Sequence, residues 1–194
     1  MPKLTADFYE REDVLAISRE LLGKVLCTNL DGKLTSGIIV ETEAYAGLTD
    51  KASHAFEGRR TKRTETMYAS GGSAYIYLCY GIHHLFNIVT NKENIPHAVL
   101  IRAIIPQDGI KIMLKRRNKK KRNQSLTAGP GTLTQALDIT IGKSGVSLMD
   151  NLIWVEDQNI HYKNQDILAN PRVGVQYAGK DSKNPWRFKI ENCP

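Results

Sequence analysis

The chain has 194 residues, of which 41% are hydrophobic, and its 27 Lys and Arg outnumber 20 Asp and Glu to give a formal net charge of +7. This length supports one well-buried core and is short for two, so we expect a single domain over residues 1–194. The positive charge favours a polyanionic partner or an anionic membrane surface. No stretch reaches the roughly 18 apolar residues that span a bilayer, and the N-terminus lacks the apolar segment of a signal peptide, which predicts a cytoplasmic protein.

The cysteine pattern indicates neither disulfide bonds nor a structural zinc site. Cys27, Cys79 and Cys193 are odd in number, lie far apart and form no CxxC pair. The sequence therefore predicts no disulfide framework and no zinc site. We expect Cys27 and Cys79 to be buried apolar residues.

The first third of the chain is predicted to form a helix followed by a hairpin. Apolar residues at helical spacing predict a helix over residues 7–22, which ends before a glycine. Two strands, 24–30 and 34–44, are joined by Asp31-Gly32, a dipeptide that favours tight hairpin turns. The segment 47–73 is polar and irregular, and loops of this length in compact domains are more often functional than idle.

The middle of the chain is predicted to be a meander. Strands are expected at 73–78, 85–91 and 98–105, with Gly81 marking the bend between the first two. A short helix over 109–115 follows. This part of the sequence supplies most of the predicted sheet.

The last third begins with the basic run 115–122, which holds seven cations in eight residues. Such a block repels itself and forms either a mobile, solvated loop or a source of non-specific affinity for DNA. Gly129-Pro130-Gly131 then leads into a helix over 132–137, and short strands are expected at 152–156 and 172–177. Because strands cluster between helices, the fold class is α+β: a compact domain with a curved, mostly antiparallel β-sheet flanked by helices, and a long functional loop.

The segment 40–45, Val-Glu-Thr-Glu-Ala-Tyr, is the most informative part of the sequence. In an extended strand, Glu41, Glu43 and Tyr45 share one face. Taken alone, this face is either solvated or chemically active. Further polar and aromatic residues along the chain favour chemistry: His54, Tyr75, Tyr77, Tyr80, Asn87 and Arg102.

These motifs resemble the bacterial members of the alkyladenine (3-methyladenine) DNA glycosylase family. The resemblance rests on Glu43-Ala44-Tyr45, the nine-residue step to His54, Tyr-Ile-Tyr-Leu-Cys-Tyr-Gly at 75–81, Asn87-Ile88, Leu-Ile-Arg-Ala at 100–103, and Gly129-Pro130 with Leu-Thr-Gln-Ala-Leu at 133–137. It extends from about residue 15 to 155. It implies a monofunctional hydrolase without metal or cofactor, which removes damaged purines of the 3-methyladenine, 7-methylguanine, hypoxanthine and ethenoadenine class from duplex DNA.

The resemblance also implies the catalytic roles. Glu43 matches the general base that activates water for attack on the sugar, and Arg102 and Asn87 match residues that line the same pocket. Independently of the family, cleavage of an N-glycosidic bond passes through a positively charged sugar. A carboxylate near this sugar stabilises its charge and accepts a proton from the attacking water. Glu41 either orients Glu43 or Arg102, or forms a structural salt bridge.

The aromatic residues match the part of the family site that holds an extruded base. Tyr45, His54 and Tyr77 match the walls of the slot, and Tyr80 matches the side chain that fills the gap in the duplex. Extruding a nucleotide costs a few kcal/mol, and stacking on aromatic side chains offsets this cost by about 1–3 kcal/mol per base. We expect Tyr75 to be a packing residue.

Residues 58–64 form a cluster of cations and hydroxyls in the long loop. Arg59, Arg60, Thr61 and Arg63 suit DNA phosphates, although such a cluster can equally be a solvated loop. The expected partner is double-stranded DNA bound by a monomer at the nucleoid.

Two other functions fit parts of the pattern. One is a non-enzymatic nucleic-acid-binding module, which leaves Glu43 without a purpose. The other is a metal-dependent hydrolase that uses His83, His84 and Glu43, but adjacent histidines at a bend point in different directions.

Overall fold

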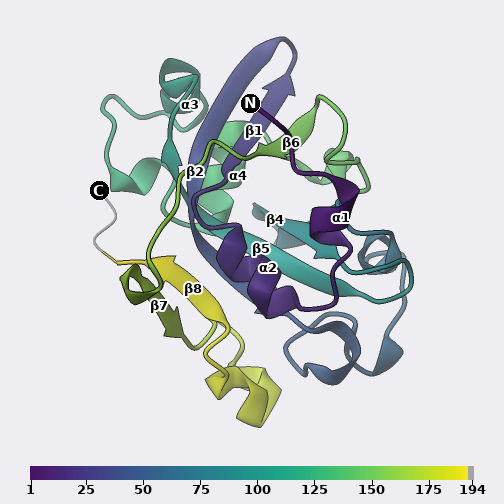
Figure 1. Ribbon diagram of the computed structural model, residues 1–194. Coiled ribbons are helices and arrows are strands. Elements are labelled where there is room, and N and C mark those ends of the chain that lie inside the picture. Colours follow the sequence, from purple (N-terminus) through teal and green to yellow (C-terminus); the bar gives the residue numbers. More distant parts are fainter. Residues whose placement is uncertain (192–194) are drawn as a thin grey trace.

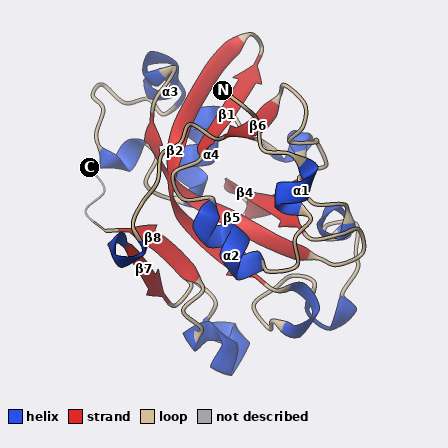
Figure 2. Cartoon of the chain, in the orientation of Figure 1, coloured by secondary structure: helices blue, strands red, loops and turns tan. Residues whose placement is uncertain are grey.

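One antiparallel sheet of eight strands curls around the core in the computed structural model, which describes residues 1–191 (Figures 1 and 2). The strands lie in the order β3–β4–β5–β2–β1–β6, and β8 pairs with both β2 and β7. Their bounds are β1 Val25–Leu30, β2 Lys33–Tyr45, β3 Ala74–Cys79, β4 His83–Thr90, β5 His97–Pro106, β6 Ile153–Glu156, β7 Ile167–Asn170 and β8 Arg187–Ile190. The predicted α+β class and antiparallel sheet are confirmed.

Short helices pack around this sheet. The α-helices are α1 Ala6–Tyr9, α2 Val14–Glu20, α3 Ile110–Arg116 and α4 Pro130–Leu137. The 3-10 helices are η1 Gly47–Thr49, η2 Phe56–Gly58, η3 Glu65–Tyr68, η4 Gln124–Leu126, η5 Ile141–Lys143, η6 Asn164–Asp166 and η7 Gln176–Lys183, the last of which is kinked at Gly179. The helix α2 packs on β2 and β5, and α4 packs on β4 and β5. Within residues 1–191, no helix is both long and apolar enough to cross a bilayer.

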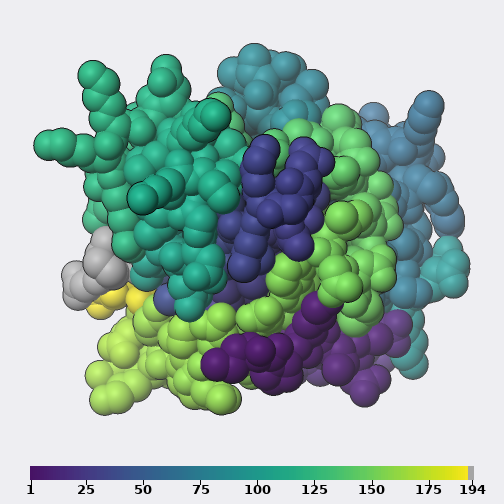
Figure 3. All heavy atoms as spheres, turned by 90° about the horizontal axis from the view of Figure 1, so that it is seen from above, coloured from purple at the N-terminus to yellow at the C-terminus, as the bar shows by residue number. Residues whose placement is uncertain are grey.

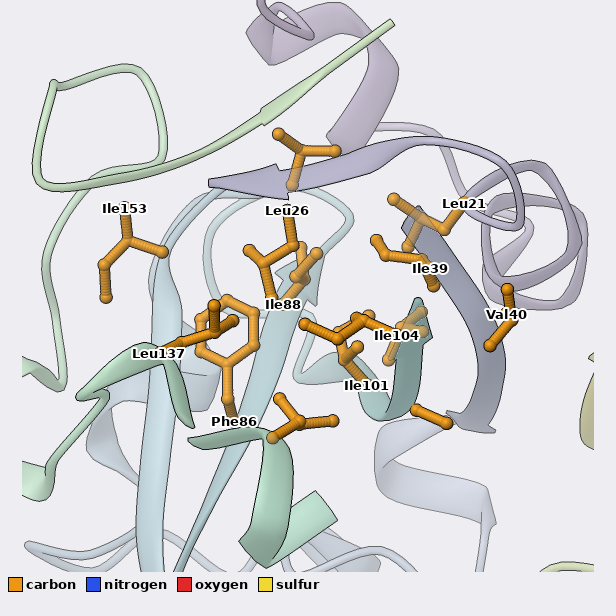
Figure 4. Close-up of a cluster of buried hydrophobic side chains, with 14 of the residues drawn as sticks. Leu21, Leu26, Ile39, Val40, Phe86, Ile88, Ile101, Ile104, Leu137 and Ile153 are labelled. Carbon is orange, nitrogen blue, oxygen red and sulfur yellow. The ribbon is translucent and has the colours of Figure 1, made fainter. Parts of the chain in front are cut away.

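Apolar side chains from both ends of the chain meet in the main core. Leu26 of β1, Ile39 of β2, Ile88 of β4 and Ile101 of β5 are buried there (Figure 4). Leu137 of α4 closes the same cluster. Each fully buried aliphatic side chain stabilises the fold by about 1.5–3 kcal/mol, so this cluster fixes how the strands and α4 are placed.

The long strand β2 exchanges partners along its length. Its first half pairs with β1, its second half pairs with β8, and β5 lies along its other edge. The register with β5 shifts on both sides of Glu41, which marks a β-bulge. A bulge bends a strand and increases its twist, and such irregularities often lie beside active sites. Here the bulge immediately precedes Glu43.

The predicted helix over 7–22 is wrong as a single element. The chain forms α1 and α2 instead, separated by residues 10–13. The side chain of Asp13 accepts hydrogen bonds from the backbone N–H groups of Leu15 and Ala16, which caps a new helix N-terminus. The apolar residues that predicted the helix all lie after this break, and residues 10–13 are all charged, so the pattern supports α2 alone.

The strand expected at 172–177 is also wrong, and the sheet takes two strands that were not predicted. Residues 172–175 form a bend, with Gly174 at φ 76°, and lead into η7. The sheet instead gains β7 and β8, each of four residues. Strands this short carry too little alternation to be distinguished from loops. Among the described strands, β7 pairs only with β8, and β8 reaches the rest of the sheet through β2, more than 120 residues away in the chain.

Alanine at Gly109, at the start of α3, is expected to destabilise the protein more than alanine at Gly32, although both glycines have the same backbone φ. Gly109 and Gly32 both have φ +69°. A Cβ at Gly109 would lie 2.4 Å from the carbonyl oxygen of Leu34, whereas a Cβ at Gly32 would meet nothing within 4 Å. We expect Gly32→Ala to lower the free energy of unfolding by about 1 kcal/mol, from its left-handed backbone alone. Gly109→Ala adds overlap with backbone atoms and should lower it by roughly 3 kcal/mol or more.

Urea denaturation of both variants measures this difference. Equal losses would show that α3 does not press on β2 as the structure has it.

Candidate active site

An aromatic-lined cavity of about 470 Å³ lies against β2, β3, β4 and β5. The long loop 47–73 and the bend 173–177 form its remaining walls. Its chemically distinctive lining residues are Tyr45, His54, Arg63, Tyr75, Tyr77, Asn87, Arg102 and Tyr177. Ligand cavities of small-molecule size usually measure 300–1,000 Å³ and combine apolar rings with a few polar groups, so this one suits a flat, planar ligand.

Glu43 lies immediately behind the cavity wall. Its side chain is fully buried, and it does not itself belong to the lining. The hydroxyl of Tyr45 donates to Oε2 at 2.9 Å, and the backbone N–H of Val173 donates to Oε1 at 2.7 Å. The Arg102 Nη1 lies 3.3 Å from Oε1. All three partners line the cavity, so the carboxylate is held at its edge by the residues that form the wall.

Glu41 holds two arginines in place. Its Oε1 accepts hydrogen bonds from Nε of Arg102 at 3.0 Å and from Nη1 of Arg187 at 3.1 Å. The sequence predicts that Glu41 either orients Glu43 or Arg102 or forms a structural salt bridge. Its salt bridges also fix the position of Arg102, so it does both. Arg102 lies between two carboxylates, and this ion pairing offsets the cost of burying their charges.

His54 and Tyr77 form one aromatic wall of the cavity. Their ring centroids lie 4.7 Å apart, with the planes at 80°. His54 Nε2 lies 3.2 Å from Nη2 of Arg63, and its Nδ1 lies 2.9 Å from the hydroxyl of Tyr75. Since a guanidinium can only donate, Nε2 accepts and Nδ1 carries the hydrogen. Burial, and then the charges of Arg63 and Arg59, lower the pKa of His54 to about 4, which keeps the ring neutral at pH 7.

Tyr75 and Asn87 support this wall from neighbouring strands. Tyr75 is almost fully buried, in keeping with the packing role expected of it, and it also touches the cavity. Asn87 of β4 lines the cavity and donates from Nδ2 to the carbonyl oxygen of Tyr75 at 3.1 Å. Tyr45 is half-buried beside Glu43; burial, and then the charge of Glu43, raise the pKa of its hydroxyl well above the usual value.

Tyr80 lies at the rim of the cavity, on the turn between β3 and β4. The turn comes at the predicted bend, and Tyr80 itself has φ 50° and is 90% exposed. Its neighbour Ile82 is 72% exposed. Two large apolar side chains in water at one hairpin tip indicate a contact surface. Cys79, expected to be buried, is half-exposed and lines the cavity, whereas Cys27 is buried as expected and Cys193 lies outside the described residues.

The segment around Arg172 is the part of the site that sequence reasoning missed. Arg172 donates to both carboxylate oxygens of Asp50 and to the carbonyl oxygen of Ala44. Its guanidinium stacks 4.7 Å from the centroid of Tyr45 and 5.0 Å from that of Trp186. Arg172 therefore holds the wall residue Tyr45 and brings the N–H of Val173 to Glu43. The 122 residues between Asp50 and Arg172 give no spacing signal.

The candidate phosphate-contacting residues differ in whether their side chains already have partners within the protein. Arg60 pairs with Glu65 at 2.7 Å and stacks on Tyr68, and the hydroxyl of Thr61 lies within hydrogen-bond distance of that of Thr64. Arg63 stacks over Tyr77 within the cavity wall. Among these four residues, the described structure pairs every side chain except that of Arg59, which is exposed.

Potential metal ligands do not gather elsewhere in the described part of the chain. Across residues 1–191, no group of three or more His, Cys, Asp or Glu side chains could hold an ion. His83 and His84 are successive residues of β4 and point to opposite faces. His84 Nδ1 already accepts a hydrogen bond from the N–H of Ile141.

The family model for methylpurine-DNA glycosylase (MPG) matches residues 7–194. The chain belongs to this family. A relative from Chlamydia felis, provisionally named a 3-methyladenine DNA glycosylase, is 48% identical over 188 residues, which cover 96% of this chain and 95% of the relative. Relatives of the same name from Bacillus cytotoxicus and Desulfitobacterium hafniense are 43% and 42% identical and are covered over 98% and 97% of their lengths. The chain is a DNA glycosylase, a hydrolase of N-glycosyl bonds with DNA as its substrate.

The lowered pKa of His54 predicts a loss of stability in mild acid. Since the folded pKa of about 4 lies below the usual 6.5, the unfolded chain binds this proton first as the pH falls. Stability from the neutral ring is present above pH 6.5 and is lost between pH 6.5 and pH 4. The free energy of unfolding should therefore fall by about 2 kcal/mol between pH 7 and pH 5 on account of this one group.

Urea denaturation of wild type and His54→Gln at pH 7 and pH 5 isolates this contribution, because every other group titrates in both proteins. Wild type should lose more stability on acidification than the variant. Parallel losses in both would contradict the burial of a neutral ring.

Proposed function

We propose that this glycosylase removes alkylated and deaminated purines of the 3-methyladenine, 7-methylguanine, hypoxanthine and ethenoadenine class, and that Glu43 activates the attacking water. The observation that carries the proposal is a fully buried carboxylate held by three residues that all line one aromatic cavity. The cavity volume and its aromatic walls suit an extruded purine. Because DNA is the substrate, we propose that the protein acts in the bacterial cytoplasm, at the nucleoid. We also propose that it acts as a monomer.

The three contacts of Glu43 leave one acceptor site of its carboxylate for the proposed water. A carboxylate offers about four lone-pair sites, and Tyr45, Val173 and Arg102 occupy three of them. A water on the fourth site would bind Oε2, the oxygen that also accepts from Tyr45, because Val173 and Arg102 both meet Oε1. The same three partners fix the carboxylate against rotation, which holds that water at one position relative to the bound sugar.

In the proposed reaction, the water oxygen attacks the anomeric carbon of the flipped nucleotide. Glu43 takes a proton from the water, and the glycosidic C–N bond breaks with its electron pair passing to the base. A 3-methyl- or 7-methylpurine carries a positive charge and leaves as a neutral base, whereas a neutral lesion such as hypoxanthine must also take a proton from an acid as it leaves. The negative charge of Glu43 also stabilises the cationic sugar as the bond breaks.

The walls Tyr45, His54 and Tyr77 would stack the extruded base. Because His54 is neutral at pH 7, this slot does not repel a cationic purine as a protonated imidazole would. No lysine is found among the described residues that line the cavity. Without an amine to form a Schiff base, the product should be an intact abasic site.

A pair of neighbouring carboxylates tests the role of Glu43. Glu43→Gln keeps the size of the side chain but cannot accept a proton, so single-turnover release of 3-methyladenine from a duplex oligonucleotide should slow by about 10²–10⁴-fold. Glu41→Gln keeps an oxygen for Arg102 and should slow release by less than about tenfold. Both variants should retain binding to a duplex with a stable abasic-site analogue, which shows that they are folded.

The assay is run with EDTA and scored as abasic sites. Wild-type rates for Glu43→Gln, or loss of wild-type activity in chelator, would overturn the assignment.

Tyr80 is proposed to fill the space that the flipped nucleotide leaves in the duplex. Tyr80→Ala removes a stacking ring worth about 1–3 kcal/mol, which should weaken binding to a lesion duplex by roughly tenfold. Binding to the same lesion in single-stranded DNA, where no gap exists, should change much less. Tyr80→Phe keeps the ring and should bind both substrates as wild type does. Fluorescence anisotropy measures all four affinities, and equal losses of Tyr80→Ala on both substrates would remove the role.

A further inference from the structure

The basic run 115–122 is only in part the mobile loop that its charge suggests. Its first residues belong to α3, and two of them anchor it to α4. Arg116 donates to the carbonyl oxygen of Ala136 at 3.1 Å and pairs with Asp138. Arg117 donates to the carbonyl oxygen of Leu126 and to the side chain of Gln135. These bonds fix the base of the run on the folded domain.

The last four cations of the run are exposed. Lys119, Lys120, Lys121 and Arg122, here called the cationic tip, are all exposed, and none forms a salt bridge with any residue in the range 1–191. Four unpaired positive charges on consecutive residues repel one another, and the fold does not compensate them. A polyanion would both relieve this repulsion and release its own counterions.

The fold connects this tip to the wall of the proposed active site. The chain leaves Arg122 through η4, forms a bridge from Ala128 to Ala103 of β5, and reaches Pro130, which lines the cavity. Only seven residues separate Arg122 from Pro130. The tip is therefore linked to the cavity wall by a short segment that is bonded to the sheet.

A groove also joins the base of the run to the Tyr80 hairpin. This groove, of about 370 Å³, is lined by Ile82 and His83 of the hairpin and by Arg116 and Gln135 on the other side. Figure 3 shows the teal segment that contains the basic run projecting at the upper left, next to the bluer hairpin at the top. A duplex that receives Tyr80 would thus extend along this groove toward the tip.

We propose that the cationic tip binds backbone phosphates of the duplex arm on one side of the flipped nucleotide. This contact extends the DNA footprint beyond the active site and carries no base sequence information, because lysine on a flexible stem recognises phosphate charge alone. The anchored base of the run limits the tip to one side of the cavity. The contact therefore concerns one arm of the duplex and not the other.

The experiment compares two charge-matched double variants. Lys120→Glu/Lys121→Glu alters the tip, and Lys33→Glu/Lys163→Glu makes the same change in net charge at exposed positions on the β1–β2 turn and before η6. Affinity for an undamaged 30-base-pair duplex is measured against salt concentration. Each phosphate contact contributes roughly 0.9 to the slope of log affinity against log salt, so the tip variant should lose about 2 from the slope while the control keeps the wild-type value.

A second measurement tests which arm is bound. Two duplexes carry a stable abasic-site analogue close to one end or close to the other, so that each has one long arm. The tip variant should lose affinity by about tenfold on one of these duplexes and remain like wild type on the other. An unchanged slope, a slope change equal to that of the control, or equal losses on both duplexes would overturn the proposal. Neither measurement involves base release, so a failure of the proposed catalytic role would leave this test intact.

Discussion

The burial of Glu43 is the constraint on which the site depends. An ionised carboxylate with no exposure to water is stable only where ion pairs and hydrogen bonds replace its hydration. The structure supplies these from three separated parts of the chain: Tyr45 on the same strand, Arg102 on β5, and the N–H of Val173. Because each partner is also a wall of the cavity, the requirement to solvate one charge brings together the side of the pocket that Tyr45, Arg102 and Val173 form.

A buried ion pair between Arg172 and Asp50 holds the residues that surround Glu43. Arg172 and Asp50 neutralise each other, and the guanidinium stacks between Tyr45 and Trp186. The loop that contains Asp50 and the bend that contains Val173 are thereby tied together across the cavity. A protein that must admit and release a base needs walls on irregular segments, and such pairs hold those segments without strand pairing.

The residues proposed to contact DNA lie on several separate segments of the surface. The proposed wedge Tyr80 and the exposed Ile82 lie on a hairpin whose backbone is fixed by β3 and β4, while the cations lie on loops anchored by a few of their own members. Arg60 and Arg63 are engaged within the long loop, and Arg116 and Arg117 are engaged on α4. Charge counted along the sequence therefore overstates the charge available to a partner.

The sequence by itself determined the α+β class, the β1–β2 hairpin, the strands β3 to β5 and the acidic face of β2, because these depend on local alternation and turn residues. The motifs also predicted the family and, through it, five of the chemically distinctive residues that line the cavity: Tyr45, His54, Tyr77, Asn87 and Arg102. Only the tertiary structure decided that β7 and β8 complete the sheet, that Arg172 pairs with Asp50, and that Val173 reaches Glu43. These features arise from contacts between residues far apart in the chain, whose pairing is set by the burial of charge and by packing against β2, and neither leaves a periodic signal in the sequence.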